Sequence, residues 1–541
     1  MSVLLALLPV LCLFGGALLY LLPLPLISRY RNGIPLLALG LSAVALTFLA
    51  RASTAPIDLF ESSAMLPELT LTLQWNGAAL PFGLCLLAMM AARVLMAHAQ
   101  DTRAFLIGLL TVSGGALLFL AADNFTSVAA AWLIVEFGLL IAPDPDADSR
   151  ARVTTAFAWN LAAIALWLSA GMILANRNIS LRLTEMELQG AAALLVLLSL
   201  WIRSGLYPAH AAAPSDVSGA SVRIGIPLLL GGYLMTRLLV AMQASMAFAN
   251  EFMILAALTI GASALVTAGQ WHGGNAFIWM LRAFGASLLL APFIGRTPEL
   301  VSASVWLTLA AFMLAVWTSI AWLWRGELAR LRLTMLVWLV PLFVAAALPL
   351  SPAFLGRVVL LNGAHTMGVA WWLLLVVCAA LYLIPIWREI LASRDIAPKP
   401  PTRFEYAALG MALLPALLIL VAPNFFMAPF GAAAQTGASV PVNLLLKPVG
   451  VTGLAFIVAG LIVPLLTWFE LARQRALRAA ILPQALTEFL DLSVVGKGLV
   501  RIYHFLRALV LSSLALLEQP PIAWLFFLAI WAAVWIGGLA R

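Results

Sequence analysis

The side chains that could do chemistry in this 541-residue chain are ionisable groups set within very apolar stretches. Such groups are costly in a low-dielectric interior, so they usually face water or a partner of opposite charge. Histidine and glutamate can exchange protons, whereas arginine stays charged and can only bias the pKa of a neighbour. We therefore predict an ion path through Glu136, Arg203, His210, Asp216, His272, Arg357 and His365.

Three further arginines lie in similar apolar surroundings: Arg223, Arg237 and Arg282. For any one of these arginines the alternative is a structural role, in which the side chain reaches out from a helix end or locks two helices together. A single histidine in a helix bundle can likewise be a hydrogen-bonded structural group and not a relay member.

Composition predicts the elements that hold these groups. Hydrophobic residues make up 64% of the chain and charged residues only 10%, which is more apolar sequence than a soluble core uses. The apolar runs are too long and unbroken for a β-barrel. Because helices satisfy their own backbone groups in lipid, we predict an all-α polytopic membrane protein. Residues 2–23 lack a basic n-region and a cleavage site, so we expect a first helix and not a removed signal.

Apolar runs long enough to cross a bilayer number about 16. They lie near residues 2–23, 33–50, 79–97, 104–121, 124–142, 152–175, 187–207, 222–243, 252–270, 275–294, 302–324, 331–350, 367–388, 404–423, 449–470 and 521–540.

Positive charge gathers in every second loop between these runs, which predicts that those loops are cytoplasmic. The long loop 51–73 and the uncharged loop 423–446 belong to the other set. With an even number of spans, both termini then lie outside. The net charge of +8 follows from these loop arginines and does not indicate a nucleic-acid partner.

Residues 484–518 form a different kind of segment. Lys497, Arg501, His504 and Arg507 follow one another at spacings of four, three and three, and the intervening residues are mostly apolar. This pattern predicts an amphipathic helix that lies along the membrane or along a partner. The alternative is an ordinary, partly buried span.

Prolines interrupt two of the apolar runs beside an arginine. Arg203 precedes Pro208, and Arg357 follows Pro349 and Pro352. Broken helices at corresponding positions of two halves are typical of transporters built from inverted repeats. Proline frees backbone carbonyl groups, and such irregular backbone is tolerated where it lines a wet interior.

Four short stretches occur in an informative order: LAADNFTSVAAAW (120–132), RSGLYPAH (203–210), GGYLMTRLL (231–239) and LPLSPAFLGR (348–357). Their order resembles that of the antiporter-like subunits of respiratory complex I, closest to NADH dehydrogenase subunit 5. That family includes the large Mrp-antiporter subunits and the membrane subunit of DAB-type inorganic-carbon complexes. The resemblance covers most of the chain and implies two inverted repeats with broken helices, followed by a long lateral helix.

The resemblance also implies a division of the chain. We expect N-terminal helices in 1–103, a first antiporter-like repeat in 104–243 and a second repeat in 252–388. C-terminal helices in 389–480, the lateral helix in 484–518 and a final span in 521–540 would follow.

The chain departs from the family pattern at its charged positions. It has only three lysines, in loops or near helix ends, and arginine stands at 203 and 357 where the family has buried lysine. The central lysine, expected near His272, is missing. The family's tryptophan matches Trp132, but the carboxylate follows four residues later, at Glu136, where it could still face the same interior.

Two functions remain open at this point. The first is a proton- or cation-translocating subunit of an energy-coupling membrane complex, either complex I-like or of the DAB type. The second is a scaffold that anchors a catalytic partner and conducts nothing, because its ion path is degenerate. A stand-alone small-molecule transporter would need a polar substrate pocket, and no polar cluster in the sequence suggests one.

The resemblance implies partners: a redox arm or a zinc-dependent, carbonic-anhydrase-like protein, with lipid around the helices. We expect a bacterial cytoplasmic membrane as the location. The isolated cysteines, Cys12, Cys85 and Cys378, have no metal-ligand or redox spacing. The sequence shows no ligand set for quinone, flavin, iron–sulfur or zinc, so we expect no cofactor, no metal and no enzymatic activity of the chain by itself.

Overall fold

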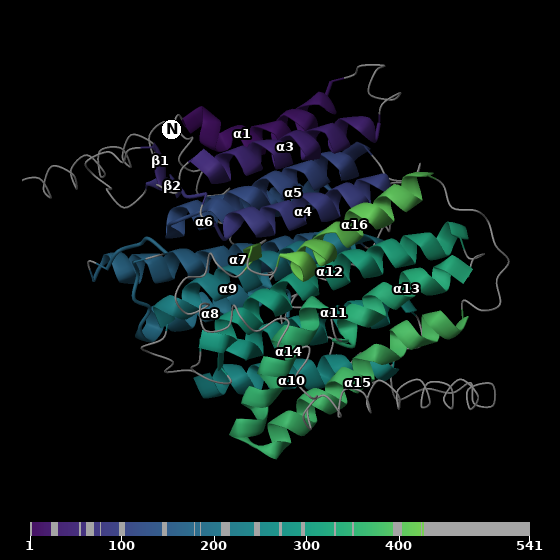
Figure 1. Cartoon of the computed structure of the whole chain (residues 1–541). Coiled ribbons are helices and arrows are strands. Elements are labelled where there is room, and N and C mark those ends of the chain that lie inside the picture. The colour runs from purple at the N-terminus through teal and green to yellow at the C-terminus, as the bar shows by residue number, and fades with distance from the viewer. Residues whose placement is uncertain are drawn as a thin grey trace, which may run out of the picture. The chain divides into compact units, whose positions relative to one another are not determined.

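A computed structural model of the whole chain provides the fold (Figure 1). It describes residues 3–22, 31–52, 56–60, 70–75, 77–96, 103–142, 149–177, 179–183, 185–206, 217–242, 249–269, 273–293, 298–328, 332–348, 351–392, 403–422 and 425–426. The predicted spans 449–470 and 521–540 and the predicted lateral helix 484–518 lie outside the described residues, so the count of about 16 spans stays a prediction.

The described residues are predominantly helical, which confirms the predicted fold class. The α-helices are α1 (Val3–Leu19), α3 (Gly33–Ala52), α4 (Ala79–Leu95), α5 (Arg103–Ala121), α6 (Phe125–Ile141), α7 (Ser149–Ala175), α8 (Gly190–Arg203), α9 (Ile226–Met242), α10 (Ala249–Gly269), α11 (Gly273–Leu290), α12 (Pro298–Leu328), α13 (Arg332–Ala345), α14 (Pro352–Met367), α15 (Val369–Ala392) and α16 (Arg403–Val421).

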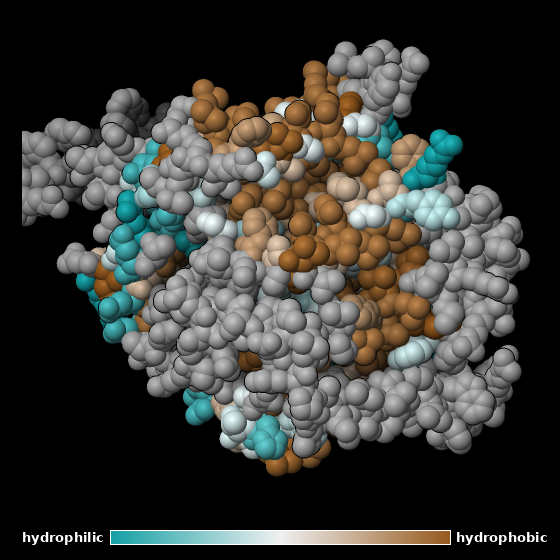
Figure 2. Space-filling model, viewed as in Figure 1, coloured by the Kyte–Doolittle hydropathy of each residue, from teal (hydrophilic) through white to brown (hydrophobic). Residues whose placement is uncertain are grey.

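Six helical segments of the described residues are long and apolar enough to cross a membrane: Arg103–Ala121, Val153–Ala175, Ser221–Leu239, Asn250–Ala268, Ala303–Leu323 and Val369–Ile390. The segment in α12 is wholly enclosed by other helices, whereas those in α7 and α15 leave much of their surface uncovered. Uncovered apolar side chains give the molecule the hydrophobic surface seen in Figure 2. Such a surface suits lipid or a neighbouring subunit.

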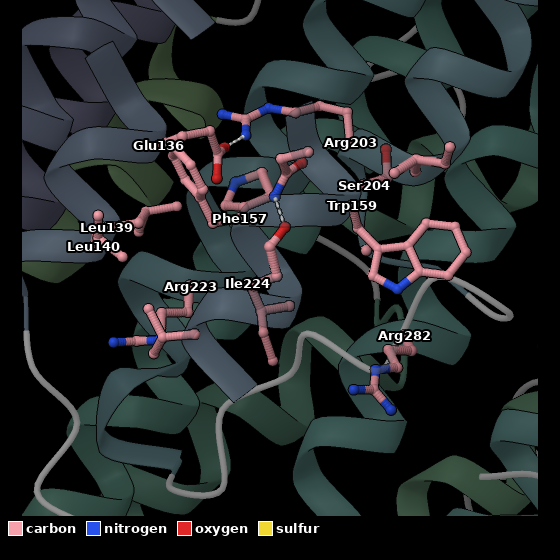
Figure 3. A pocket seen from close by; sticks show the side chains of 16 residues that line it. Glu136, Leu139, Leu140, Phe157, Trp159, Arg203, Ser204, Arg223, Ile224 and Arg282 are labelled. Carbon is pink, nitrogen blue, oxygen red and sulfur yellow. Dashed lines mark hydrogen bonds and ion pairs between the residues drawn. The ribbon is translucent and has the colours of Figure 1, made fainter. Parts of the chain in front are cut away.

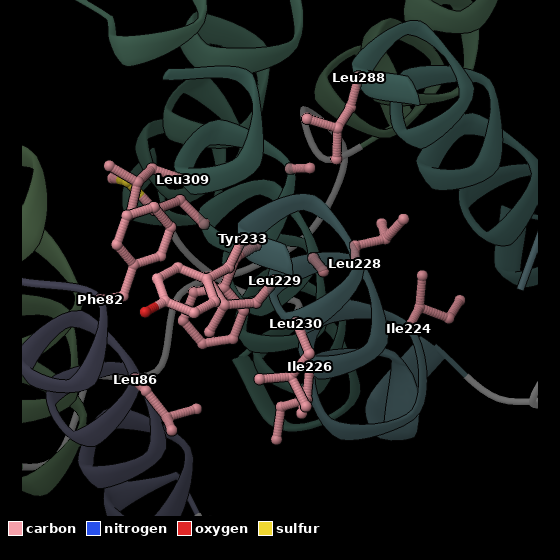
Figure 4. Close-up of a cluster of buried hydrophobic side chains, with 14 of the residues drawn as sticks. Phe82, Leu86, Ile224, Ile226, Leu228, Leu229, Leu230, Tyr233, Leu288 and Leu309 are labelled. Carbon is pink, nitrogen blue, oxygen red and sulfur yellow. The ribbon is translucent and has the colours of Figure 1, made fainter. Parts of the chain in front are cut away.

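The centre of the bundle is packed with apolar side chains around α9 (Figure 4). Phe82 of α4 lies 5.1 Å from Tyr233 of α9, measured between ring centroids. The hydroxyl group of Tyr233 donates to the carbonyl of Leu120 at 2.8 Å. This bond ties α9 to the end of α5, since a buried hydroxyl group needs a partner.

Helices α5 and α6 approach each other closely through glycine. A Cβ atom added at Gly108 would meet the backbone nitrogen of Ala142 at 2.7 Å, and one added at Gly138 would meet the backbone nitrogen of Val112 at 2.8 Å. Small residues allow two helix backbones to approach this closely. Since α6 carries Glu136, this packing fixes where the carboxylate lies.

The loop 51–73 contains a two-stranded hairpin that was not predicted. Strand β1 (Ile57–Phe60) pairs antiparallel with β2 (Leu71–Leu73). The hydroxyl group of Ser127 in α6 accepts from the backbone nitrogen of Thr72 at 2.7 Å, and the side chain of Asn124 donates to the carbonyl of Thr70. Asn124 is also the N-cap of α6, so one residue anchors both the hairpin and the helix.

The region predicted as one break between two spans contains a separate helix, α14. Its N-cap, Ser351, accepts from the backbone nitrogen of Phe354, and Pro352 occupies the first turn. Both are typical of a helix start. Gly368, with φ of 144°, separates α14 from α15. The span predicted from residue 367 corresponds to α15, and α14 was not predicted as a separate helix because it is only moderately apolar.

Candidate functional site

The central feature of the site is a buried ion pair between α6 and α8. The Nη1 atom of Arg203 donates to the Oε1 atom of Glu136, and the two side chains are 0% and 2% exposed. A buried arginine and a buried carboxylate each require a partner of opposite charge. The predicted proximity of these two groups is therefore present in the structure (Figure 3).

An aromatic ring covers the same guanidinium group. The Cζ atom of Arg203 lies 5.0 Å from the ring centroid of Trp132, which is fully buried. Trp132 precedes Glu136 by four residues on α6, so both side chains lie on one face of the helix. A cation over a tryptophan ring is attracted electrostatically, and more strongly where water is excluded.

The chain leaves the helical path directly after Arg203. Ser204 caps α8 and its hydroxyl group donates to the carbonyl of Leu200 at 2.9 Å. Gly205 has φ of 63°, a left-handed conformation that glycine adopts readily. Arg203 is thus held at a helix end. The predicted break at Pro208, with His210 and Asp216, follows in residues 207–216, outside the described residues.

A cavity of about 50 Å³ lies beside the ion pair. Roughly 10–15 Å³ of such space holds one water, so three or four waters would fit. Its walls come from α6, α7, the end of α8, the start of α9 and α11 (Figure 3). The lining residues are Glu136, Leu139, Leu140, Val153, Ala156, Phe157, Trp159, Asn160, Ile202, Arg203, Ser204, Gly205, Arg223, Ile224, Pro227 and Arg282.

Two more arginines line this cavity. Arg223 lies in a π-helical segment, Ser221–Gly225, that leads into α9, and its Nη2 atom donates to the carbonyl of Ala142 at 2.6 Å. Short π-helical segments are often found at functional sites. Arg282 of α11 lies 4.4 Å from the ring centroid of Trp279. Both arginines lie in apolar runs of the sequence, but neither belongs to the predicted ion path.

Trp159 and Asn160 of α7 also line the cavity, and neither was predicted as a site residue. Neither residue is charged, and no local pattern marks the face of α7 that packs towards the cavity. Only the tertiary packing of α6, α7 and α8 brings them beside the ion pair.

Arg357 belongs to a second place in the fold. Its Cζ atom lies 5.0 Å from the ring centroid of Phe284 and 5.1 Å from that of Tyr382. Its Nη1 atom donates to the carbonyl of Ala345, the last residue of α13, at 3.3 Å. Helix α11 contributes to both places, with Arg282 in the cavity wall and Phe284 against Arg357.

The remaining predicted residues are not gathered around the ion pair. His365 is exposed, in the last turn of α14. His272 and Pro349 lie outside the described residues, as do the predicted partner-contact residues Lys497, Arg501, His504 and Arg507. Of the predicted path, the structure brings Glu136 and Arg203 together and places Arg357 and His365 elsewhere.

Arg237 has a structural environment. Its Nη2 atom lies 3.0 Å from the carboxylate of Asp123, and its Nη1 atom donates to the carbonyl of Ala122 at 2.7 Å. Burial raises the pKa of the Asp123 carboxyl group above its usual value, and Arg237 opposes that shift. This pair ties α9 to the connection between α5 and α6.

Metal binding has no support within the described residues, where no group of three or more His, Cys, Asp or Glu side chains could hold an ion.

Comparison with known proteins identifies the fold and no close relative. No protein-family model matches the sequence, and a search of curated proteins finds no match. Many solved chains share the fold, and three of them illustrate it at low sequence identity. A chain of the Mrp complex from a Dietzia species is 16% identical, with a TM-score of 0.71 over 96% of this chain. This chain spans 63% of the length of that Mrp chain.

Two further solved chains are matched over nearly their whole length. A chain of the membrane-bound sulfane sulfur reductase, an archaeal respiratory membrane complex, is 16% identical with a TM-score of 0.65, covering 98% of this chain and 99% of that one. A chain of respiratory complex I from Thermus thermophilus with bound NADH is 18% identical with a TM-score of 0.66, covering 82% and 100%. These matches confirm the antiporter-like fold that the order of the motifs predicted. The protein is a multi-pass membrane protein with this fold.

Proposed function

We propose that this chain is a proton- or cation-translocating subunit of a multi-subunit membrane complex, with Glu136 as the group that binds and releases the ion. The observation that carries the proposal is the buried Glu136–Arg203 pair beside a cavity that can hold water. Ionisable groups at membrane depth are typically functional. The fold shared with chains of three membrane complexes supports the same direction.

The two members of the pair have different roles in this proposal. Arg203 keeps its charge at all relevant pH values, so it cannot release a proton. It holds Glu136 at one wall of the cavity and supplies a fixed positive charge. Glu136 exchanges its proton with water in the cavity. A continuous line of water is then required on both sides of Glu136.

We extend the proposal to the two halves of the chain. The first, predicted as residues 104–243, would correspond to α5 to α9, and the second, predicted as residues 252–388, to α10 to α15. Arg203 at the end of α8 and Arg357 near the start of α14 would be counterparts. Asp216, His210, His272 and His365 would belong to later steps of the path, and the breaks near Pro208, Pro349 and Pro352 would open the interior to water.

The energy for ion translocation would come from a partner protein. A redox arm is one candidate and a zinc-dependent, carbonic-anhydrase-like protein is the other, and the location would be a bacterial cytoplasmic membrane. The lateral helix 484–518 would contact the neighbouring subunit through Lys497, Arg501, His504 and Arg507. The chain itself would perform no covalent chemistry.

One observation favours a second function, that of a non-conducting scaffold. The ion pair is nearly free of solvent and its guanidinium group is covered by Trp132. A closed pair of this kind can simply lock α6 to α8. The scaffold would keep the fold and its partner while passing no ions.

Ion flux in the reconstituted complex separates the two functions. We expect Glu136→Gln to lower proton or sodium flux at least tenfold. Glu405→Gln serves as the matched control, because Glu405 is also a buried glutamate but lies on α16, outside the cavity wall. Glu136→Asp, which keeps the carboxylate, should retain part of the flux. Partner retention is measured on the same samples. Unchanged flux in an intact Glu136→Gln complex would establish the scaffold.

A further inference from the structure

The end of α8 that carries Arg203 lies directly against the backbone of α9. Arg203 is the last residue of α8, and Ser204 and Gly205 turn the chain away from the helical path. The turns of the helix therefore hold Arg203 from one side only. The packing of Ser204 against its surroundings then helps to fix where the guanidinium group of Arg203 can reach.

The hydroxyl group of Ser204 makes the contact with α9. Ser204 is buried, and its Oγ atom donates to the carbonyl of Leu200 at 2.9 Å. A Cβ atom added at Gly231 of α9 would lie 2.4 Å from this Oγ atom and 3.9 Å from the carbonyl oxygen of Leu200. The hydroxyl group thus fills the space between the last turn of α8 and the backbone of α9. Only glycine at position 231 leaves room for it.

Helix α9 is a firm support at this point. The hydroxyl group of Tyr233, two residues after Gly231, donates to the carbonyl of Leu120 at 2.8 Å. The next residue after Gly231, Gly232, packs against α12 instead, where an added Cβ atom would lie 2.4 Å from the hydroxyl oxygen of Thr308. A displacement at the Gly231 contact would therefore move the end of α8 more readily than α9, since close-packed interiors transmit strain.

We propose that Gly231 is a positioning residue for the Glu136–Arg203 pair. It accommodates the hydroxyl group of Ser204 and thereby sets the place of Arg203. A buried ion pair stabilises the fold only when its geometry is good, so a small displacement of the end of α8 weakens it. The consequence for ion flux rests on the proposed function, whereas the consequence for the pair does not.

Gly231→Ala adds one methyl group, which must displace either the hydroxyl group of Ser204 or the end of α8. Gly232→Ala is the matched control. Its new Cβ atom would also lie 2.4 Å from a hydroxyl oxygen, that of Thr308, which likewise donates to a carbonyl one turn earlier. The nearest atoms to this Cβ atom belong to α11 and α12 and not to α8. The control is therefore at least as crowded and leaves the contact with α8 intact.

A compensating substitution tests whether the effect passes through the hydroxyl group. In the double variant Gly231→Ala with Ser204→Ala, the methyl group at 231 takes the place of the lost hydroxyl group. This methyl group would lie 3.6 Å from the Cβ atom of Ser204, which is an ordinary van der Waals contact. Substitutions that conserve the packed volume are tolerated best. The double variant should therefore recover most of the stability and flux that Gly231→Ala loses.

The first measurement is the melting temperature of the purified full chain, with its bound partners, in backgrounds with and without the pair. Glu136→Leu together with Arg203→Met removes both charges of the pair. We expect Gly231→Ala to lower the melting temperature by roughly 1–4 °C with the pair present. Without the pair the loss should fall to roughly half, because contacting sites are energetically coupled. Gly232→Ala should lower the melting temperature equally in both backgrounds.

The second measurement is ion flux in the reconstituted complex. Gly231→Ala should lower flux roughly three- to tenfold, because a small misplacement of a functional group is costly. Gly232→Ala should lower it less than about twofold. If Glu136→Gln leaves flux unchanged, the proposed function fails, and the melting temperatures still test the role of Gly231.

Two outcomes overturn the inference. A loss of melting temperature in Gly231→Ala that is the same with and without the pair means that Gly231 only packs two helices together. A double variant that is no better than Gly231→Ala means that the hydroxyl group of Ser204 does not transmit the effect.

Discussion

At the scale of residues, Glu136 and Arg203 can each be charged in the buried interior only because the other lies beside it. Two buried charges lose their hydration, and their attraction roughly offsets that loss. Removing one member leaves the other charge buried without a partner. This lowers the stability of the fold far more than replacing both members by apolar residues would. The pair is therefore both a mechanical link between α6 and α8 and the reason that a charged carboxylate can lie in the buried interior of the bundle.

Arg203→Ala should lower the stability of the protein by about 3–5 kcal/mol, the typical cost of breaking a buried pair. Arg182→Ala is the control, because the Arg182–Glu185 pair is exposed and an exposed pair contributes only about 0–1 kcal/mol. Thermal unfolding of the purified protein in detergent measures both variants. Similar shifts for the two would show that the Glu136–Arg203 pair is not buried in the protein as it exists.

The sequence allowed part of this site to be predicted. Trp132 and Glu136 are four residues apart, which places both side chains on one helix face. The predicted break after Arg203 indicated that this arginine faces the same interior. Arg223 and Arg282 were recognisable as charges in apolar runs, but no local pattern tells which interior they face. Trp159 and Asn160 could not be found, because their role depends only on how α7 packs.

At the scale of elements, helix α6 is positioned at both of its ends. The N-cap Asn124 joins its start to the hairpin β1–β2, and Gly108 of α5 lets the backbone near Ala142 approach closely. Long apolar runs made the helices predictable. The hairpin was not predictable, because strands of three and four residues are too short to show an alternating hydrophobic pattern. The hydrogen bond from Thr72 to Ser127 of α6 depends on the tertiary structure.

The close approach of α5 and α6 can be tested at Gly108. In Gly108→Ala the new Cβ atom would lie 2.6 Å from the Cβ atom of Ala142 and 2.7 Å from its backbone nitrogen, so the helices must separate. We expect a loss of about 1–3 kcal/mol, the usual cost of overpacking. Gly40→Ala is the control, since no atom lies within 4 Å of the new Cβ atom there. A lower melting temperature for Gly40→Ala than for Gly108→Ala would contradict this packing.

At the scale of the whole molecule, the described helices divide into enclosed and uncovered ones. The spanning segment of α12 is buried throughout, whereas α1 and α3 expose leucines such as Leu4 and Leu37. Figure 2 shows hydrophobic side chains gathered on one face of the described part of the molecule. A bundle of this construction is stable only in lipid or against other subunits.

The distribution of loop arginines predicts an orientation with the N-terminus outside, and this prediction can be tested by labelling. In a background without Cys12, Cys85 and Cys378, we expect Ser62→Cys in the loop 51–73 to react with a membrane-impermeant maleimide added to intact cells. Ser149→Cys, next to the arginines of the following loop set, should react only after the membrane is opened. The reverse pattern would place the N-terminus inside.

The most direct measurement for the account as a whole is the infrared titration of carboxyl groups in the membrane-reconstituted protein. If Glu136 exchanges protons with water in the cavity beside the ion pair, the difference spectrum between two pH values contains a band of a protonated carboxyl group that disappears in Glu136→Gln. The same band should persist in Glu405→Gln. A spectrum that Glu136→Gln leaves unchanged would mean that Glu136 keeps one protonation state, and the pair would then be a lock between two helices.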